Sequence, residues 1–187
     1  MVYGEFVVWM ILSDFDLDNV IRDKRLVIKP FSRDMVRENG IDFRLSNEIV
    51  RHRNMPANFV YDPSDSKSIK NAFTTSKRTS RMILEPKEQV LLSTYEHLSM
   101  PDDLVAFVEL RSTWARNGLS MPPTIIDAGF KGTITLEVIN NAPFRMLLKP
   151  KYPFAHIIFM KATSRIRNPY SGSYFEQHGV KLPKVIK

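Results

Sequence analysis

Cysteine is absent from the 187-residue chain. This absence excludes disulfide bonds, a thiol nucleophile and any zinc site built on thiolate ligands. The fold must therefore be stabilised by burial of apolar surface, for which the chain is long enough.

Long hydrophobic runs are also lacking. Residues 1–12 come nearest, but Glu5 interrupts them, and no run reaches the roughly 20 apolar residues that a membrane-spanning helix requires. A basic leader and an Ala-x-Ala-like cleavage site are missing too. We therefore expect a soluble, cytoplasmic protein with no membrane partner.

What the chain does contain fits one compact domain, because 43% of its residues are hydrophobic. The formal net charge of +7 favours a polyanionic partner. Charge alone does not separate nucleic acid from a nucleoside triphosphate. Most of the basic residues, which are spread along the chain, are typical of an ordinary solvated surface.

Short strands dominate the expected secondary structure. Ser13 and Asp16 form a capping-box pattern that predicts a short helix over about residues 14–23. Many short strands, as in a β-sandwich or barrel, are expected after it. Apolar runs bounded by Pro, Gly, Asn or Asp place them at residues 26–28, 41–45, 82–84, 89–93, 104–111, 132–140, 145–149 and 154–161.

Two segments have few apolar anchors. Residues 54–81 are rich in polar side chains and predict a long surface loop or an irregular hairpin. Residues 168–187 contain two glycines and two prolines with little periodicity, which predicts a mobile arm or a disordered basic tail.

A polar cluster beyond residue 110 contains the side chains best suited to chemistry. A strand ending in Arg111-Ser112 and turning through Gly118 can present a guanidinium and a hydroxyl to a phosphate, although an ordinary polar strand end has the same pattern. Asp127, two residues before Gly129, is most simply a turn former.

Glu137 is expected on the strand face opposite to Leu136 and Val138. That face either contacts water or lines a cavity. A strand glutamate is usually solvent-exposed, and only a nearby Arg, Ser and substrate would make it a catalytic base.

Three motifs together resemble the signature of dCTP deaminases, in the dCTP deaminase and dUTPase superfamily. They are Arg-Ser-x-x-Ala-Arg-x-Gly-Leu at 111–119, Ile-Asp-x-Gly-Phe-x-Gly at 126–132 and Thr-Leu-Glu at 135–137. Further stretches follow the family in order and spacing, including 25–31, 39–45 and 101–104, so the resemblance extends from Met10 to Pro183. The Pro-Pro loop at 120–125 resembles archaeal members.

The resemblance implies a mainly β fold, a distorted jelly-roll-like β-barrel with a short N-terminal helix. It also implies a homotrimer with active sites at subunit interfaces. By the same resemblance, Glu137 is the general base for attack of water on cytosine C4, and Ser112 and Arg116 hold the water and the carboxylate. The product is dUTP, for pyrimidine deoxynucleotide biosynthesis.

The substrate contacts that the resemblance implies come from four further residues. Asp127 contacts the deoxyribose 3′-hydroxyl, Arg111 binds the triphosphate, and Tyr170 and Gln177 belong to an arm that closes over it. Residues 10–167 would then form the barrel domain and 168–187 the arm. Ser173 stands where a basic residue is usual, and residues 1–9 precede the family's usual start, so Met10 is expected to be the initiator.

A protein-bound catalytic metal is not expected. The zinc route to cytosine deamination needs a cysteine pair that this chain lacks, and its four histidines (His52, His97, His156 and His178) show no metal-ligand spacing. His156, within an apolar strand, is more typical of a satisfied barrel histidine. Mg²⁺ is expected to accompany the substrate triphosphate.

Two alternatives remain open. dUTPases share the fold, and Phe130 within Ala-Gly-Phe-Lys-Gly resembles bifunctional members, so release of dUMP and pyrophosphate is an alternative activity. A nucleotide-binding regulator or a basic nucleic-acid-binding protein without catalysis is less favoured, because binding alone does not require Glu137 near a triphosphate. No nucleic-acid partner is expected.

Overall fold

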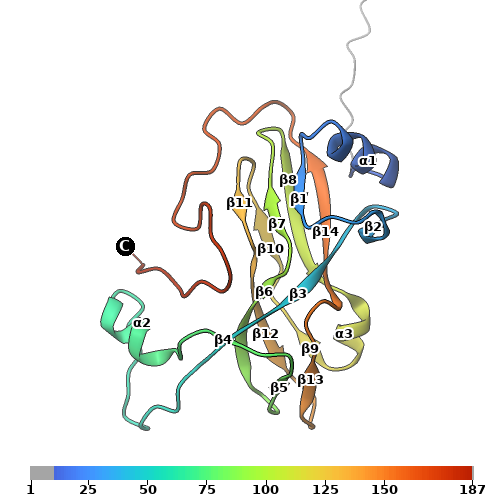
Figure 1. The fold of residues 1–187 in the computed structure, drawn as a ribbon. Coiled ribbons are helices and arrows are strands. Elements are labelled where there is room, and N and C mark those ends of the chain that lie inside the picture. The colour runs from blue at the N-terminus through green and yellow to red at the C-terminus, as the bar shows by residue number, and fades with distance from the viewer. Residues whose placement is uncertain (1–10, 187) are drawn as a thin grey trace, which may run out of the picture.

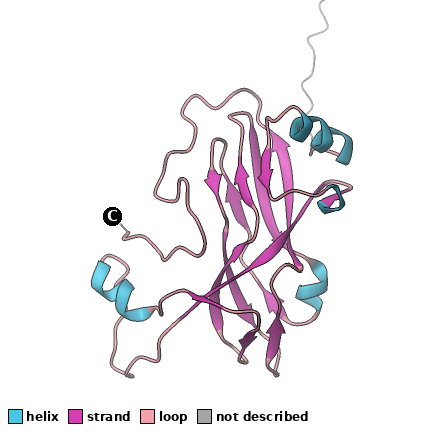
Figure 2. Cartoon of the chain, in the orientation of Figure 1, coloured by secondary structure: helices cyan, strands magenta, loops and turns pink. Residues whose placement is uncertain are grey.

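Antiparallel strands make up most of the fold (Figure 2). The computed structural model describes residues 11–186, so the expectation that translation begins at Met10 lies outside the described residues. The strands are β1 Val27–Lys29, β2 Val36–Arg37, β3 Gly40–Arg51, β4 Lys77–Arg78, β5 Met82–Leu84, β6 Gln89–Thr94, β7 His97–Ser99, β8 Leu104–Leu110, β9 Leu119–Ser120, β10 Thr124–Ile126, β11 Lys131–Gly132, β12 Thr135–Asn140, β13 Met146–Leu148 and β14 Pro153–Lys161.

The largest sheet is curled, with the strand order β10-β8-β14-β3-β6-β12-β9. Two smaller sheets complete the wall, β1-β7-β11 and β13-β5 (Figure 1). Strand β3 is long enough to pair with β14 at its start and with β6 at its end, with an irregular register between Leu45 and Ile49. The predicted mainly β, barrel-like fold class is confirmed.

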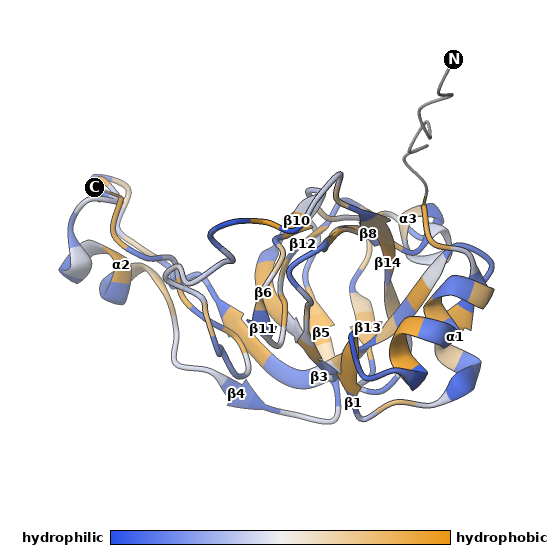
Figure 3. Ribbon diagram, turned by 90° about the horizontal axis from the view of Figure 1, so that it is seen from above, coloured by the Kyte–Doolittle hydropathy of each residue, from blue (hydrophilic) through white to orange (hydrophobic). Residues whose placement is uncertain are grey.

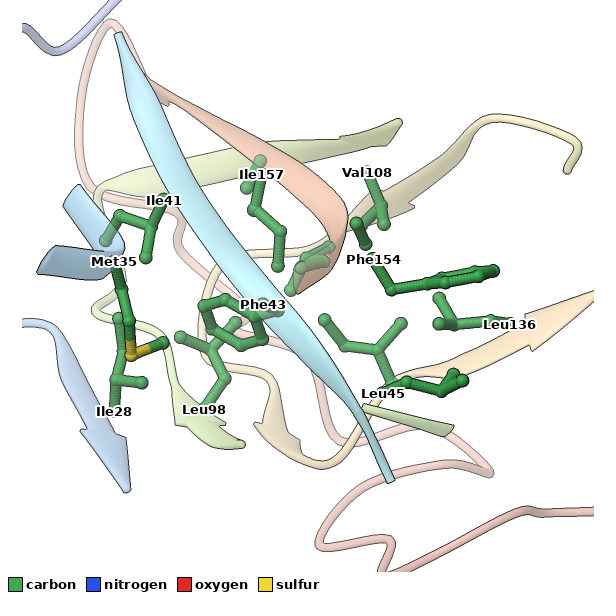
Figure 4. Packing of buried hydrophobic residues seen from close by; sticks show 14 of the residues in the cluster. Ile28, Met35, Ile41, Phe43, Leu45, Leu98, Val108, Leu136, Phe154 and Ile157 are labelled. Carbon is green, nitrogen blue, oxygen red and sulfur yellow. The ribbon is translucent and has the colours of Figure 1, made fainter. Parts of the chain in front are cut away.

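The core fills the inside of this curled sheet (Figure 4). Side chains alternate along each strand, so every second residue faces inward. Phe43 of β3 and Phe154 and Phe159 of β14 have no exposed surface. Full burial of a side chain of this size contributes about 1.5–3 kcal/mol.

The helices are short: α1 Asp14–Arg22, the 3₁₀ helix η1 Arg33–Met35, α2 Ser66–Ala72 and α3 Ser112–Arg116. Helix α1 begins with the predicted capping box, in which the Ser13 side chain accepts from the Asp16 N–H and Asp16 accepts from the Ser13 N–H. Between residues 11 and 186 no helix is long and apolar enough to cross a membrane.

Three predictions of local structure were wrong in part. Residues 54–81 contain α2 and β4, and α2 forms because Asp65 caps the N–H groups of Lys67 and Ser68. The strand predicted over 104–111 ends at Leu110, and the chain then turns into α3. The single strand predicted over 132–140 divides into β11 and β12.

The segment 168–186 has no helix or strand and runs along the barrel beside β11 and β12 (Figure 1). Its contacts hold it against its own chain: the Tyr170 N–H donates to the Ala128 carbonyl at 2.8 Å, and the Thr133 N–H donates to the Gln177 carbonyl at 2.9 Å. The backbone of Gln177 comes so close to Gly132 that a Cβ there would lie 2.7 Å from the Gln177 carbonyl oxygen. Whether this segment is a separate functional unit stays a prediction.

Candidate functional site

Glu137 projects from β12 on the face predicted for it. Along β12 the inward residues Leu136 and Val138 are buried, whereas Glu137 between them is half-buried. Strand β12 is held by β6, where Glu137 is registered with Leu91. Burial raises the pKa of the Glu137 carboxyl above its usual value, and its own backbone N–H only partly offsets this.

A hollow of about 440 Å³ lies in front of Glu137. This volume is within the range of small-molecule sites, about 300–1,000 Å³. Its lining includes four of the predicted site residues, Glu137, Asp127, Tyr170 and Gln177. The structure therefore brings the predicted base and three predicted substrate contacts to one place.

Asp127 reaches this hollow from the end of β10. Ile126 is buried, and the exposed Asp127 begins a turn in which its carbonyl accepts from the Phe130 N–H at 3.1 Å. Asp127 is thus both a turn former and a lining residue. The ring of Phe130 lies 5.9 Å from that of Tyr170, which connects the turn to the C-terminal segment.

Gln177 contributes an unpaired acceptor. Its side chain is buried, and its Nε2 donates to the Thr133 carbonyl at 2.6 Å. Within residues 11–186 its Oε1 has no hydrogen-bond partner. A buried polar atom without a partner is costly, and as an amide oxygen Oε1 can only accept a hydrogen bond.

Arg111 and Ser112 lie elsewhere, in a second hollow of about 560 Å³. They stand where β8 passes into α3, and Trp114 anchors this turn because its Nε1 donates to the Pro153 carbonyl at 2.9 Å. Gly118, at φ +98°, ends the turn after α3. Ser112 and Arg116 are exposed, and Arg116 lines neither hollow.

The predicted catalytic residues are therefore not assembled within one chain. The two hollows share no lining residue. Viewed from above, the C-terminal segment and α2 lie at one end of the barrel and α3 at the other (Figure 3). The structure brings Glu137 together with Asp127, Tyr170 and Gln177, but not with Arg111, Ser112 or Arg116.

Several lining residues were not predicted. His52 and Phe73 extend the first hollow towards α2, and their rings lie 4.6 Å apart. Asp42 and Arg37 line the second hollow together with His156. Asp42 stands between the buried Ile41 and Phe43, so its side chain lies on the opposite face of β3. No local sequence pattern indicates that this face is covered as well.

The described residues offer no ready-made metal cage, because no group of three or more His, Asp or Glu side chains could hold an ion between residues 11 and 186. Nδ1 of His156 donates to Oδ1 of Asp42 at 2.9 Å, because the pKa of the Asp42 carboxyl is lowered and an ionised carboxylate only accepts. This contact agrees with the interpretation of His156 as a satisfied barrel histidine.

Comparison with known proteins shows which family and which individual sequences this chain is similar to. A family model described as dCTP deaminase-like matches residues 11–162. A dCTP deaminase of Sulfurisphaera tokodaii is 43% identical over 175 residues, which cover 94% of this chain and 92% of the relative. A probable deoxyuridine 5′-triphosphate nucleotidohydrolase of Sulfolobus islandicus rod-shaped virus 1 is 42% identical over 175 residues. That match covers 94% of this chain and 99% of the viral protein.

Among solved structures, a 2′-deoxycytidine 5′-triphosphate deaminase from Agrobacterium tumefaciens is similar, with a TM-score of 0.64 and 20% identity. The match covers 82% of this chain and 49% of that one, so this chain spans about half of the longer protein. At this identity the likeness concerns the fold.

Proposed function

Because the chain belongs to the dCTP deaminase-like family, we propose that this enzyme hydrolyses dCTP to dUTP and ammonia with Glu137 as general base. The observation that carries the proposal is a half-buried carboxylate, of raised pKa, in a hollow of nucleotide size. Such a reaction supplies dUTP to pyrimidine deoxynucleotide biosynthesis, and we expect it to take place in the cytoplasm.

In the proposed mechanism, Glu137 takes a proton from water as the water oxygen bonds to C4 of cytosine, and passes that proton to N3. The tetrahedral centre then loses its hydroxyl proton to the amino group through Glu137. The C4–N bond breaks, releasing ammonia and leaving the C4 carbonyl of uracil. A positioned base of this kind contributes about 10²- to 10⁴-fold in rate.

The raised pKa of Glu137 suits this role. A base whose pKa lies closer to neutrality holds a proton more readily between the two transfers than an ordinary carboxylate does. Ser112 and Arg116 of a neighbouring copy would hold the water and Glu137, and would stabilise charge at the tetrahedral centre.

Substrate binding is assigned to the remaining residues. Asp127 would accept from the deoxyribose 3′-hydroxyl, and Arg111 would bind the triphosphate. Tyr170 and Gln177 would bind it from the arm, residues 168–187, which closes over the barrel formed by 10–167. Tyr170 and Gln177 line the hollow of Glu137, which supports an arm that lies against this site.

We further propose a homotrimer with active sites between chains. The two hollows lie apart in one chain, so a complete site requires a second copy. An apolar row supports such packing, because Phe107 and Ile125 are registered across β8 and β10 and are 36% and 60% exposed. Identical chains that meet through two different surfaces form a ring when the rotation between neighbours closes.

Mg²⁺ is expected to arrive with the triphosphate. The ion would neutralise phosphate charge together with Arg111.

One observation favours a second activity. The viral relative named as a probable deoxyuridine 5′-triphosphate nucleotidohydrolase is nearly as similar as the deaminases. The alternative is therefore an enzyme that also, or instead, hydrolyses dUTP to dUMP and pyrophosphate.

Incubation with dCTP and Mg²⁺, followed by separation of the products, tests both proposals. We expect ammonia and dUTP, and the appearance of dUMP with pyrophosphate would establish the bifunctional version. Glu137→Gln should lower the rate of deamination by about 10²-fold or more while nucleotide binding persists. Substantial turnover by this variant would remove Glu137 from the role of base.

A further inference from the structure

Asp42 of β3 lies at the centre of a charged cluster in the second hollow. Its side chain is only 4% exposed. Oδ2 accepts a hydrogen bond from Arg37 Nε at 2.8 Å and lies 3.3 Å from Arg111 Nε, while Oδ1 lies 2.9 Å from His156 Nδ1. One buried carboxylate therefore contacts three basic side chains from three different strands or strand ends.

This carboxylate is held in its charged form. Burial by itself would raise the pKa of Asp42, but the hydrogen bonds from His156 and Arg37 and the charge of Arg111 outweigh that effect and lower the pKa. An ionised Asp42 attracts a guanidinium, and the burial of its carboxylate limits screening by solvent.

The contact leaves the outer end of Arg111 available. Nε of Arg111 lies 3.3 Å from Oδ2 of Asp42, and a guanidinium binds an oxyanion through its terminal nitrogens in a fork geometry. Glu38 and Glu109 line the same hollow, so an Arg111 that was not held would have competing carboxylates within the same space.

We propose that Asp42 is a positioning residue for substrate binding, which fixes Arg111 so that its terminal nitrogens meet the triphosphate. Arg37 and His156 support this role by orienting both oxygens of Asp42. The inference rests on the proposed function, in which Arg111 binds the phosphates of dCTP. Asp42 itself does not contact the substrate.

Asp42→Asn tests the proposal in the full-length enzyme. Removing the charge should raise KM for dCTP about 10-fold, as expected when the ion pair that orients Arg111 is lost, and change kcat less than about 3-fold. Such a split distinguishes a binding defect from a defect in the chemical step.

A double-mutant cycle shows whether the effect passes through Arg111. Arg111→Ala should raise KM by itself, and adding Asp42→Asn should then raise it little further, because residues that act as a unit are not additive. The matched control is Asp103→Asn. Asp103 is another buried aspartate that pairs with an arginine, Arg25, and it lines neither hollow, so KM should not change.

The outcomes distinguish a failure of the proposed function from a failure of the role assigned to Asp42. A wild-type protein that does not deaminate dCTP contradicts the proposed function. An active wild type with an unchanged KM in Asp42→Asn, or with additive effects in the cycle, overturns the role of Asp42. If Asp42→Asn does not fold, His156→Leu provides a second test, because it removes the hydrogen bond to Oδ1 of Asp42. It should raise KM by a smaller factor, and this rise should disappear when Arg111→Ala is also present. A rise in KM that persists with Arg111→Ala counts against the inference.

Discussion

The half-buried position of Glu137 on β12 lowers the stability of the folded protein when the carboxyl is charged, because burial disfavours the charged form. A carboxyl whose pKa is raised on folding favours the folded state below that pKa, and this advantage is lost as the pH rises through it. At neutral pH, Glu137→Gln removes the cost of the charge. We expect the variant to have the same Tm as the wild type or a higher one, with the difference shrinking in acid, as measured by thermal denaturation from pH 4 to 8.

The control is Glu109→Gln, the same change at an exposed position of β8. It should leave Tm unchanged at every pH. A lower Tm for Glu137→Gln at neutral pH would mean that the carboxylate makes a stabilising contact, contrary to the burial described above.

Glu137 and Asp42 show how far single positions can be predicted from sequence. The face of Glu137 follows from alternation along one strand, and it is confirmed. The burial of Asp42 does not follow from its strand, because its partner His156 lies 114 residues away in sequence. Local periodicity carries no information about such a contact.

The C-terminal segment is anchored by a small apolar cluster that α2 creates. Val180 and Leu182 pack against this cluster. Its buried members are Val50, Ile69, Ala72, Phe73 and Leu91. Leu182→Ser should weaken the anchor, so we expect faster cleavage by trypsin after Lys181 and Lys184 and a raised KM for dCTP.

Ile186→Ser is the matched control, because Ile186 is 64% exposed and should contribute little to the anchor. Cleavage and KM should both stay as in the wild type. Equal cleavage rates for Leu182→Ser and the wild type would show that the segment is held by its hydrogen bonds instead.

Helix α2 also shows which elements escape sequence analysis. Long strands such as β14, predicted at 154–161 and observed at Pro153–Lys161, have enough alternating residues to be recognised. Helix α2 has seven residues and few apolar ones, and its capping residue Asp65 was the one available signal. Two-residue strands such as β9 and β11 exist only through their partners in the folded chain.

The separation of the two hollows is the feature of the molecule that sequence could not reveal. The motifs that resemble the family are collinear, but their order along the chain does not say which copy supplies each side chain. In the folded chain Glu137 lines one hollow, and Arg111 and Ser112 line the other. An active site that needs both must be shared between copies, and the exposed row of Phe107 and Ile125 lies on strands that reach both hollows.

Mixing two inactive variants tests this arrangement. Glu137→Gln and Arg116→Ala each remove one half of the proposed site, so each alone should be inactive. When the two are unfolded together in equal amounts and refolded, random assembly should restore about a quarter of the wild-type sites, since half of the chains supply each intact half. Deamination is measured as ammonia release, with each variant refolded alone as the control. Two variants that refold together into trimers without regaining activity would place Glu137 and Arg116 in the same chain's site, whereas in the folded chain Arg116 does not line the hollow of Glu137.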